Sequence, residues 1–346
     1  MAGAGLPVRR LVLRSLRSAE RDVHLALDPI RLGLSVPQAF AMLLRDRPAA
    51  IFTTGGYVAI PVLLAARLLR IPTLIWEGNV IPGRSVRATA GLATAVAVSF
   101  EATCEALGLG GAPRSRPCLV TGTPIRDIAS IDRLAARARF GLAGGDRLVL
   151  VFGGSQAVRR LNDAVAAALP EVVGRVHLVH VTGDAGYAAA LANREKLPQD
   201  ARARYRPSPF LGEDLLTALA AADLLIGRAG SSTLAEAAAL GLPMVVVPYP
   251  HAGGHQRVNA AVLADAGAAR IVDDADFDAA ALLDAIRIVA EPSVHLAMSA
   301  AARSLGRPGA AAAIAAILEA LADRGPLPDQ AAIRRIATRG ANGDQP

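Results

Sequence analysis

Glycine and hydroxyl residues directly follow an apolar run in the middle of the sequence. The run Leu148–Phe152 leads into Gly153-Gly154-Ser155-Gln156 and then into a helical pattern. Glycine lets backbone N–H groups approach a ligand, and the first turn of a helix carries roughly half a positive charge. The spacing therefore predicts a phosphate site. On spacing alone, a tight turn with a serine helix cap is an equally good interpretation.

A second junction of this kind carries more hydroxyl groups. The run Leu224–Gly227 leads through Arg228-Ala229-Gly230 into a predicted helix at Ser232–Leu240. The residues around the start of this helix are Ser231, Ser232, Thr233, Leu234 and Ala235. Free N–H groups and hydroxyls suit a diphosphate, and Glu236, one turn further on, suits the diol of a ribose. The alternative is a capping run with a solvated glutamate. A third junction is Thr54–Tyr57.

Neutral hydrogen-bonding side chains follow a third apolar run, Met244–Pro248. They are His251, His255, Gln256 and Asn259. This is the predicted carboxyl end of a parallel strand, where α/β sheets bind ligands. Neutral donors and acceptors suit the hydroxyls of a sugar, and the alternative is a polar loop. The glycines between the two histidines argue against a helical zinc site.

Other motifs are excluded or explained without a ligand. Lys196 is the only lysine, so the chain has no P-loop. Gly108, Gly110 and Pro113 fail the dinucleotide fingerprint at its last glycine. The stretch 274–276, Asp-Ala-Asp, matches a pattern of metal-dependent sugar transferases, but its place at the start of a helix favours a capping cluster. No motif requires a metal or a cofactor.

The composition is that of a folded protein with two domains. The chain has 346 residues, of which 53 % are hydrophobic and 19 % charged, which excludes a disordered chain. A net charge of +7 permits nucleic acid or an anionic membrane as a partner, but 3 % aromatic residues disfavour single-stranded nucleic acid. Cys104 and Cys118 lie in separate segments, which suits a reducing cytosol and excludes a disulfide scaffold. We expect no membrane-spanning helix.

Short apolar runs alternate with Ala/Leu/Arg-rich helical stretches along the chain. Most runs are continuous rather than alternating, which is typical of parallel strands covered on both faces. This order predicts a doubly wound α/β architecture. The candidate strands are Ala49–Thr53, Pro72–Trp76, Ala95–Ser99, Cys118–Thr121, Leu148–Phe152, His177–Val181, Leu224–Ile226, Met244–Pro248 and Arg270–Val272.

The helical stretch Ile131–Arg139 and the turn Ala143–Asp146 separate two groups of strands. About two Arg-rich helices precede the first group. We expect an N-terminal domain over residues 1–128, a C-terminal domain over 129–308, a C-terminal helix over 309–325 and a flexible tail over 326–346.

Five groups of these motifs, taken in order, resemble the MurG family of peptidoglycan glycosyltransferases, family 28. The resemblance extends from about Gly5 to Asp323. It rests on Thr54-Gly55-Gly56-Tyr57-Val58 with Pro61, Trp76-Glu77-Gly78-Asn79 with Pro82-Gly83, Gly122-Thr123-Pro124-Ile125-Arg126, Gly153-Gly154-Ser155-Gln156, and Arg228-Ala229-Gly230 through Glu236-Ala237 to Gly241-Leu242-Pro243 and Asn259-Ala260.

The resemblance implies a GT-B fold, in which two Rossmann-like domains face a cleft, the N-terminal one incomplete here. It implies an inverting transfer of GlcNAc from UDP-GlcNAc to the C4 hydroxyl of MurNAc in undecaprenyl-pyrophosphoryl-MurNAc-pentapeptide (lipid I), giving lipid II for peptidoglycan synthesis. The expected location is the cytoplasmic face of the cell membrane, as a peripheral protein. No nucleic acid is expected as a partner.

By matched motif, the resemblance also implies roles for single residues. Asn79 would contact the donor sugar, while Arg126 and the backbone near Leu211 would contact the nucleotide. Ser155 would reach the diphosphate. Residues Ser231 to Glu236 would bind the diphosphate and the ribose, and Gln256, with its neighbour His255, would bind the GlcNAc hydroxyls.

The chain departs from the family pattern at several positions. The family has His-Glu-Gln-Asn at 76–79, a glycine at Ala157 and a glutamine at His255. A Gly-Gly-Thr-Gly-Gly-His loop, whose histidine is the family's proposed base, has no counterpart, and His24 does not match it. The catalytic base is therefore unassigned, and we expect the polypeptide as written to bind UDP but to transfer sugar poorly. The alternatives are a UDP-sugar-binding remnant, and another GT-B enzyme such as a UDP-GlcNAc 2-epimerase or a glycolipid transferase.

A basic and partly apolar stretch lies near the N-terminus. Its arginines are interleaved with leucines and a valine, and they are Arg9, Arg10, Arg14, Arg17 and Arg21. An anionic membrane attracts such a segment by ~1 kcal/mol per basic residue. An ordinary amphipathic surface helix fits the pattern equally well, and the lipid-linked acceptor favours the membrane.

Overall fold

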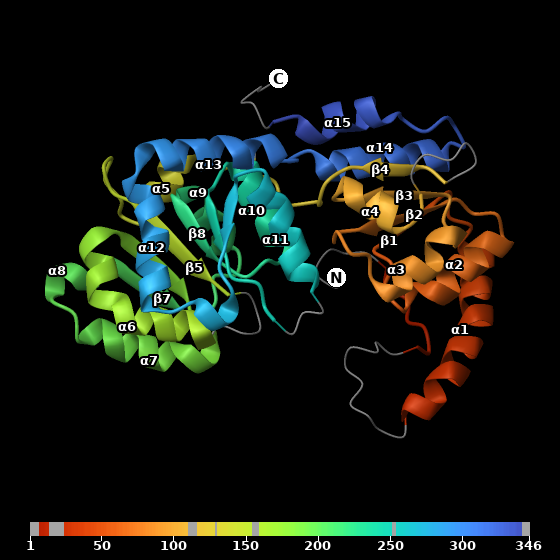
Figure 1. The fold of residues 1–346 in the computed structure, drawn as a ribbon. Coiled ribbons are helices and arrows are strands. Elements are labelled where there is room, and N and C mark those ends of the chain that lie inside the picture. Colours follow the sequence, from red (N-terminus) through yellow and green to blue (C-terminus); the bar gives the residue numbers. More distant parts are fainter. Residues whose placement is uncertain are drawn as a thin grey trace. The chain divides into compact units, whose positions relative to one another are not determined.

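The computed structural model describes residues 7–13, 24–109, 116–128, 130–153, 159–250 and 254–340 (Figure 1). The chain divides into two compact units. Unit 1 comprises residues 1–122 and 312–336, and unit 2 comprises residues 123–311 and 337–346. Each unit contains one parallel sheet with helices packed on it. This confirms the prediction of two parallel-sheet α/β domains.

Unit 1 is built on a sheet of four strands in the order β1-β2-β3-β4. The middle strand β3 is continuously apolar and buried, and β2 has an apolar centre between Thr73 and Glu77, as expected of strands covered on both faces. Its first elements are α1 (His24–Asp46), β1 (Ile51–Thr53), α2 (Ala59–Leu68), β2 (Thr73–Glu77), α3 (Arg84–Thr89), η3 (Ala90–Leu92), β3 (Ala95–Val98), α4 (Glu101–Ala106) and β4 (Cys118–Val120).

The end of the chain returns to unit 1 as α14 (Ala310–Ala322) and α15 (Gln330–Thr338), which lie beside its sheet (Figure 1). Gln330 pairs with the outer strand β4, because its Oε1 accepts the Val120 N–H at 2.8 Å and its Nε2 donates to the Val120 carbonyl at 3.0 Å. Ile333 and Ala337 are fully buried. The prediction of a flexible tail from residue 326 is therefore wrong for residues 326–340.

Unit 2 is built on a sheet of six parallel strands in the order β10-β9-β8-β5-β6-β7. Its elements are α5 (Arg133–Arg139), β5 (Leu148–Phe152), α6 (Arg159–Arg175), β6 (His177–Val181), α7 (Asp184–Glu195), α8 (Gln199–Arg202), β7 (Tyr205–Ser208), α9 (Asp214–Ala221), β8 (Leu224–Gly227), α10 (Ser231–Leu240), β9 (Met244–Val246), α11 (His255–Asp265), β10 (Ala269–Ile271), η4 (Asp274–Asp276), α12 (Ala279–Ala290) and α13 (Pro292–Leu305).

A buried polar network joins three elements of this unit. The His180 ring lies between the Tyr205 hydroxyl and the Asn162 Oδ1, at 2.9 Å from each. Asn162 also donates to the Thr182 carbonyl at 3.0 Å. Burial lowers the pKa of His180 to about 3 and raises the pKa of Tyr205, so the ring is neutral at physiological pH. The network therefore fastens α6 to β6 and β7 without any charge.

Several predicted boundaries differ from the observed ones. The units divide between Gly122 and Thr123 rather than near residue 128, and most of α14 belongs to unit 1. Where about two helices were expected before the first strand, the described residues there form α1, and residues 7–13 are not helical. The edge strand β7 was not predicted, because its sequence Tyr-Arg-Pro-Ser is polar and contains a proline.

The two cysteines form a disulfide, which the sequence interpretation did not anticipate. Cys104 lies on α4 and Cys118 begins β4, with their Cα atoms 5.9 Å apart. The segments are separate in sequence, but α4 packs against β4 in the fold. The inference from two separate segments to a chain without disulfide bonding is therefore wrong.

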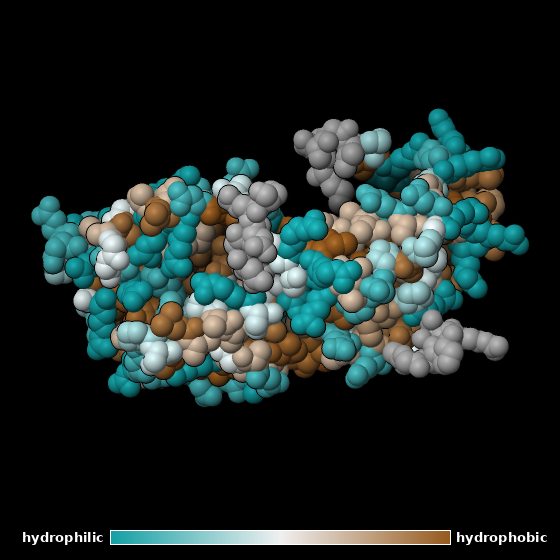
Figure 2. All heavy atoms as spheres, turned by 90° about the horizontal axis from the view of Figure 1, so that it is seen from above, coloured by the Kyte–Doolittle hydropathy of each residue, from teal (hydrophilic) through white to brown (hydrophobic). Residues whose placement is uncertain are grey.

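One stretch of the described chain, Pro292–Ala322, is long and apolar enough to span a membrane by length and composition alone. No such segment was expected, because the sequence contains no uncharged apolar run of sufficient length. This stretch meets the criterion although it includes Arg303 and Arg307. It comprises two helices, and α13 packs against α10 and α12. The face in Figure 2, seen from above the view of Figure 1, mixes hydrophilic and apolar side chains. The contacts of α13 with α10 and α12 show that this helix packs within unit 2.

Candidate functional site

The topology of unit 2 defines where a ligand site is expected. Strand β5 lies between β6 and β8, so the chain proceeds to one side of β5 and then returns to the other. Such a switch point leaves a crevice at the carboxyl ends of the two strands. The polar segments that follow β5 and β8 therefore lie at the same edge of the sheet.

Strands β5 and β8 approach each other closely at this edge. A Cβ atom on Gly227 would lie 2.2 Å from the Phe152 carbonyl oxygen, so only glycine fits there. The Arg228 N–H donates to the same oxygen at 3.3 Å. Gly153 is buried directly after β5. Ser155, which the sequence analysis assigns to the diphosphate, lies outside the described residues, as do all of residues 154–158.

The helix α10 begins at Ser231, one residue before the predicted start, with Gly230 as its N-cap. Ser231, Ser232 and Thr233 therefore occupy the first turn, where the backbone N–H groups lack helical acceptors. Ser231 and Thr233 are half-buried and Ser232 is exposed, while Leu234 is buried in the core. Three hydroxyls and the positive end of a helix thus share this edge of the sheet.

Glu236 lies on the next turn and is 4 % exposed. Its two carboxylate oxygens accept hydrogen bonds from a single side chain, with Arg126 Nε at 2.8 Å and Arg126 Nη2 at 2.9 Å. This hydrogen-bonded pairing raises the pKa of Arg126. The Arg126 side chain remains 42 % exposed. The carboxylate of Glu236 is therefore buried and ionically paired, and its partner Arg126 is partly exposed.

The Arg228 side chain contacts other residues of unit 2 at this edge of the sheet. Its guanidinium is buried, lies 2.5 Å from the Asp274 carboxylate, donates to the Val247 carbonyl at 3.0 Å and stacks over the Tyr249 ring. The first aspartate of the stretch 274–276 is thus an ion-pair partner. The expectation of a helix-capping cluster is wrong here, because η4 is a short 3-10 turn whose N-cap, Asp273, makes no side-chain cap bond.

The segment after β9 contributes Gln256 and its neighbours. Gln256 is half-buried at the start of α11, and its Oε1 accepts the Tyr249 N–H at 2.8 Å. This bond closes the loop between β9 and α11, of which residues 251–253, including His251, lie outside the described residues. His255 is half-buried beside Gln256, and Asn259 is buried one turn further on.

Leu211 lies in the turn that leads into α9. It is half-buried, and its carbonyl accepts the Asp214 N–H at 2.9 Å. The structure thus places Arg126, Ser231–Glu236, Leu211 and Gln256 all in unit 2.

Asn79 belongs to unit 1 and is held at three points. Its backbone N–H and its Nδ2 both donate to Glu77 Oε1, at 2.9 and 3.0 Å, and its carbonyl accepts from Thr103 Oγ1 at 3.0 Å. Glu77 Oε2 accepts the Gly83 N–H at 2.9 Å. A carboxylate only accepts hydrogen bonds, so the amide nitrogen of Asn79 must face Glu77 and the amide oxygen must face away.

Glu77 is the residue that the sequence analysis missed as part of the site. The motif Trp76-Glu77-Gly78-Asn79 contains it, but the family resemblance implies a role for Asn79 alone. An acidic residue at the end of a buried apolar strand was the available signal, because a carboxylate that is 6 % exposed requires hydrogen-bond donors. In the structure it supports the loop 77–83 and orients Asn79.

The described residues offer no cluster of three or more His, Cys, Asp or Glu side chains that would hold a metal ion. The charged groups at this edge of unit 2 include the Arg126–Glu236 and Arg228–Asp274 pairs. Hydroxyls, helix N–H groups and a paired carboxylate suit the phosphates and ribose of a nucleotide.

Family models match both halves of the chain. The glycosyltransferase family 28 N-terminal domain matches residues 4–98, and the C-terminal domain matches residues 148–314. Solved structures agree with this division. MurG of Acinetobacter baumannii superposes with a TM-score of 0.67 at 27 % identity, over 84 % of this chain and 80 % of that one. A putative UDP-N-acetylglucosamine 2-epimerase of Listeria monocytogenes, 16 % identical with a TM-score of 0.64 over 86 % and 82 %, shares the fold.

Curated relatives are similar over most of their length. The UDP-N-acetylglucosamine–N-acetylmuramyl-(pentapeptide) pyrophosphoryl-undecaprenol N-acetylglucosamine transferase of Roseiflexus sp. (strain RS-1) is 37 % identical, over 93 % of this chain and 80 % of the relative. The enzyme of the same name from Moorella thermoacetica is 39 % identical, over 84 % and 78 %. The chain is therefore a glycosyltransferase of family 28 and belongs to the MurG family.

Proposed function

We propose that the chain transfers GlcNAc from UDP-GlcNAc to the C4 hydroxyl of MurNAc in lipid I and so forms lipid II for peptidoglycan synthesis. The names of its relatives describe this transfer. The observation that carries the proposal is the edge of unit 2 where three hydroxyls, the N-terminus of α10 and the Arg126–Glu236 pair lie together.

In this proposal the nucleotide binds along α10. The first-turn N–H groups and the hydroxyls of Ser231, Ser232 and Thr233 bind the diphosphate, with Ser155 beside them. The ribose diol donates to Glu236, whose carboxylate is held in place by its two hydrogen bonds from Arg126. The backbone near Leu211 completes the nucleotide end.

The reaction is an inverting displacement at C1 of GlcNAc, with UDP as the leaving group. Negative charge grows on the diphosphate as the bond to C1 breaks. Donors already aimed at that position lower the barrier by roughly 3 kcal/mol each. Gln256 with His255 binds the hydroxyls of the transferred sugar and orients C1. The family resemblance separately assigns Asn79 of unit 1 to contacts with the donor sugar. The base that deprotonates the acceptor hydroxyl is unassigned.

The test compares binding and transfer in the same preparation. Calorimetry with UDP measures the nucleotide site, and transfer of radiolabelled GlcNAc to lipid I measures the reaction. Lipid II formation that depends on Glu236 supports the proposal, whereas turnover of UDP-GlcNAc without lipid I indicates epimerase chemistry. Binding of UDP without any transfer indicates a nucleotide-sugar-binding remnant.

We further propose that unit 1 contacts an anionic membrane surface. Residues 7–13 lie along α1, because Gln38 accepts the Val12 N–H at 3.0 Å and donates to the Arg10 carbonyl at 3.2 Å. Arginines flank a group of apolar side chains that are more than half exposed: Val8, Val12, Ile30 and Leu34. Exposed apolar groups among basic ones suit a bilayer interface. Loss of co-sedimentation with phosphatidylglycerol vesicles in an Ile30→Ser/Leu34→Ser variant is the expected result.

A further inference from the structure

A cavity of about 150 Å³ opens at the other end of the unit 2 sheet. It lies where β8 and β9 begin, whereas Glu236 and the hydroxyls of α10 follow the carboxyl end of β8. Its apolar wall includes Ile131, Leu219 and Leu242. The cavity is therefore separate from the proposed nucleotide site.

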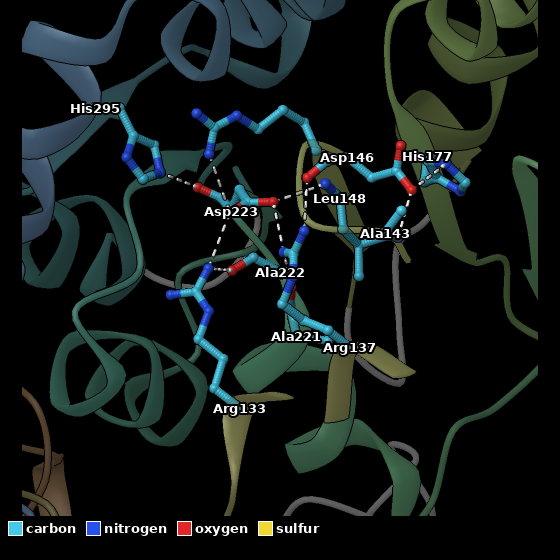
Figure 3. Close-up of polar contacts among 11 residues, drawn as sticks. Arg133, Arg137, Ala143, Asp146, Leu148, His177, Ala221, Ala222, Asp223 and His295 are labelled. Carbon is cyan, nitrogen blue, oxygen red and sulfur yellow. Dashed lines mark hydrogen bonds and ion pairs between the residues drawn. The ribbon is translucent and has the colours of Figure 1, made fainter. Parts of the chain in front are cut away.

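The charge around this cavity is unbalanced. Asp223 is the one acidic residue that lines it, and it is 3 % exposed. Three guanidinium groups share this carboxylate, those of Arg133 at 2.9 Å, Arg137 at 3.1 Å and Arg147 at 3.7 Å. Figure 3 shows Arg133 and Arg137 converging on Asp223 from different directions. One carboxylate cannot neutralise three cations.

A fourth arginine adds to the excess. Arg303 lines the same cavity and forms no ion pair or side-chain hydrogen bond with any residue that the structure describes. Its side chain lies across Gly241, where a Cβ atom would come within 2.5 Å of Arg303 Cγ. The glycine thus lets the long side chain lie flat over the turn. Arg303 is therefore placed by packing and not by an acidic partner.

The arginines also oppose one another electrostatically. Burial is the main cause of a lowered pKa for Arg133, and the charges of Arg137, Arg303 and Arg147 lower it further. His295, on the cavity wall, lies 2.9 Å from the Asp223 carbonyl oxygen through its Nε2 and adds no negative charge (Figure 3). An anion placed between Arg133 and Arg303 would relieve this repulsion.

We propose that this cavity binds a small oxyanion, a phosphate dianion that is either free orthophosphate or the phosphate end of a small metabolite. Arg303 and Arg133 supply charge-assisted hydrogen bonds, which suit phosphate oxygens. The apolar wall and the small volume restrict the ligand to about the size of one phosphate group with a short substituent. The site does not depend on the function proposed for the opposite edge.

The experiment titrates orthophosphate into the full chain by calorimetry, with UDP at saturation so that the nucleotide site is filled. A Kd at or below about 1 mM is the expected result. Glycerol 3-phosphate is titrated in parallel. Tighter binding of glycerol 3-phosphate identifies a phosphorylated metabolite, and tighter binding of orthophosphate identifies the free ion. No saturable binding of either probe would overturn the proposal.

Variants then locate the binding. Arg303→Gln is expected to raise the Kd at least about tenfold, because it removes the one unpaired cation of the cavity. Arg303→Lys keeps the charge and is expected to retain binding within about threefold. Arg287→Gln, an exposed arginine on α12, is the matched control and should leave the Kd unchanged. Equal affinities in the Arg303→Gln variant and the wild type would contradict the assignment.

Discussion

Unit 2 buries two carboxylates at opposite ends of the same strand, and they are held in different ways. Asp223 is bound by three arginines and by the Leu148 N–H at 2.8 Å, so it has no lone pair to offer a ligand. Glu236 is bound by one arginine whose side chain is 42 % exposed. The comparison distinguishes a structural carboxylate from one that a ligand can share.

The largest expected effect concerns Asp223. An Asp223→Asn variant leaves three clustered guanidinium groups without a counter-charge, and we expect a loss of about 3 kcal/mol or more in the free energy of unfolding. Urea denaturation measures this loss. Asp214→Asn, which breaks an exposed pair with Arg139, is the control and should cost less than about 1 kcal/mol. Similar losses in both variants would show that the buried Asp223 contributes no more to stability than an exposed ion pair does.

His180 is a buried titratable group of unit 2 whose hydrogen-bond partners, Tyr205 and Asn162, are uncharged, unlike those of Asp223 and Glu236. The pKa of His180 is about 3 in the folded state, below its unfolded value, so the unfolded chain binds the extra proton first as the pH falls. Stability is then fully present above the unfolded pKa and declines down to the folded pKa. From about pH 7 to pH 4 this one group accounts for a loss of about 3 kcal/mol. In a His180→Gln variant, the free energy of unfolding should therefore fall less steeply between pH 7 and pH 4 than in the wild type. The same dependence on pH in both proteins would contradict this prediction.

The third prediction addresses Glu236 directly. Glu236→Gln removes the charged acceptor, and we expect UDP affinity to fall about 30-fold, or about 2 kcal/mol, with little change in stability. Calorimetry with UDP and with 2′-deoxy-UDP separates the ribose contact from general damage. The wild type should discriminate between the two ligands more strongly than the variant does. Unchanged UDP affinity would show that the nucleotide binds elsewhere.

The smallest effect is expected in unit 1. Glu77 is a third buried carboxylate, and the hydrogen bonds recorded for it come from uncharged donors. Glu77→Gln places an amide N–H against a backbone N–H and loosens the loop that orients Asn79. We expect the KM for UDP-GlcNAc to rise about fivefold while the Kd of UDP stays constant. Glu101→Gln on α4 is the control and should leave the KM for UDP-GlcNAc unchanged. If Glu77→Gln raised the Kd of UDP as much as the KM for UDP-GlcNAc, a role of Glu77 confined to the sugar would be refuted.

Continuous apolar runs made the central strands predictable. The bounds of β5 and β6 match the expected Leu148–Phe152 and His177–Val181, because apolar residues predominate in strands buried on both faces. The buried His180 of β6 is tolerated there because Tyr205 and Asn162 hydrogen-bond its ring. Strand β7 pairs on one side only and tolerates arginine and proline, so its composition carries no such signal. Helix α15 escaped notice because its apolar stripe follows Gly325-Pro326 near the end of the chain.

The sequence identified individual residues of the candidate site but not which of them pair with each other. Arg126 and Glu236 were each assigned to the nucleotide, yet they are 110 positions apart and their pairing appears only in the fold. The Asp223 cluster was not anticipated, since its arginines come from segments that carry no motif. Local patterns indicate which residues face an edge of a sheet, whereas contacts across the sheet depend on the topology.

The return of α14 and α15 to unit 1 has a consequence for synthesis on the ribosome. Unit 2 is almost one continuous piece of chain, whereas unit 1 needs Gln330 to cover the edge of β4. The last strand of unit 1 therefore emerges about 200 residues before its covering helix, on the order of 10–40 s at ~5–20 residues per second. Throughout that interval the edge of β4 is open to pairing with other nascent chains, so the half translated first stays incomplete until almost the whole chain has been made.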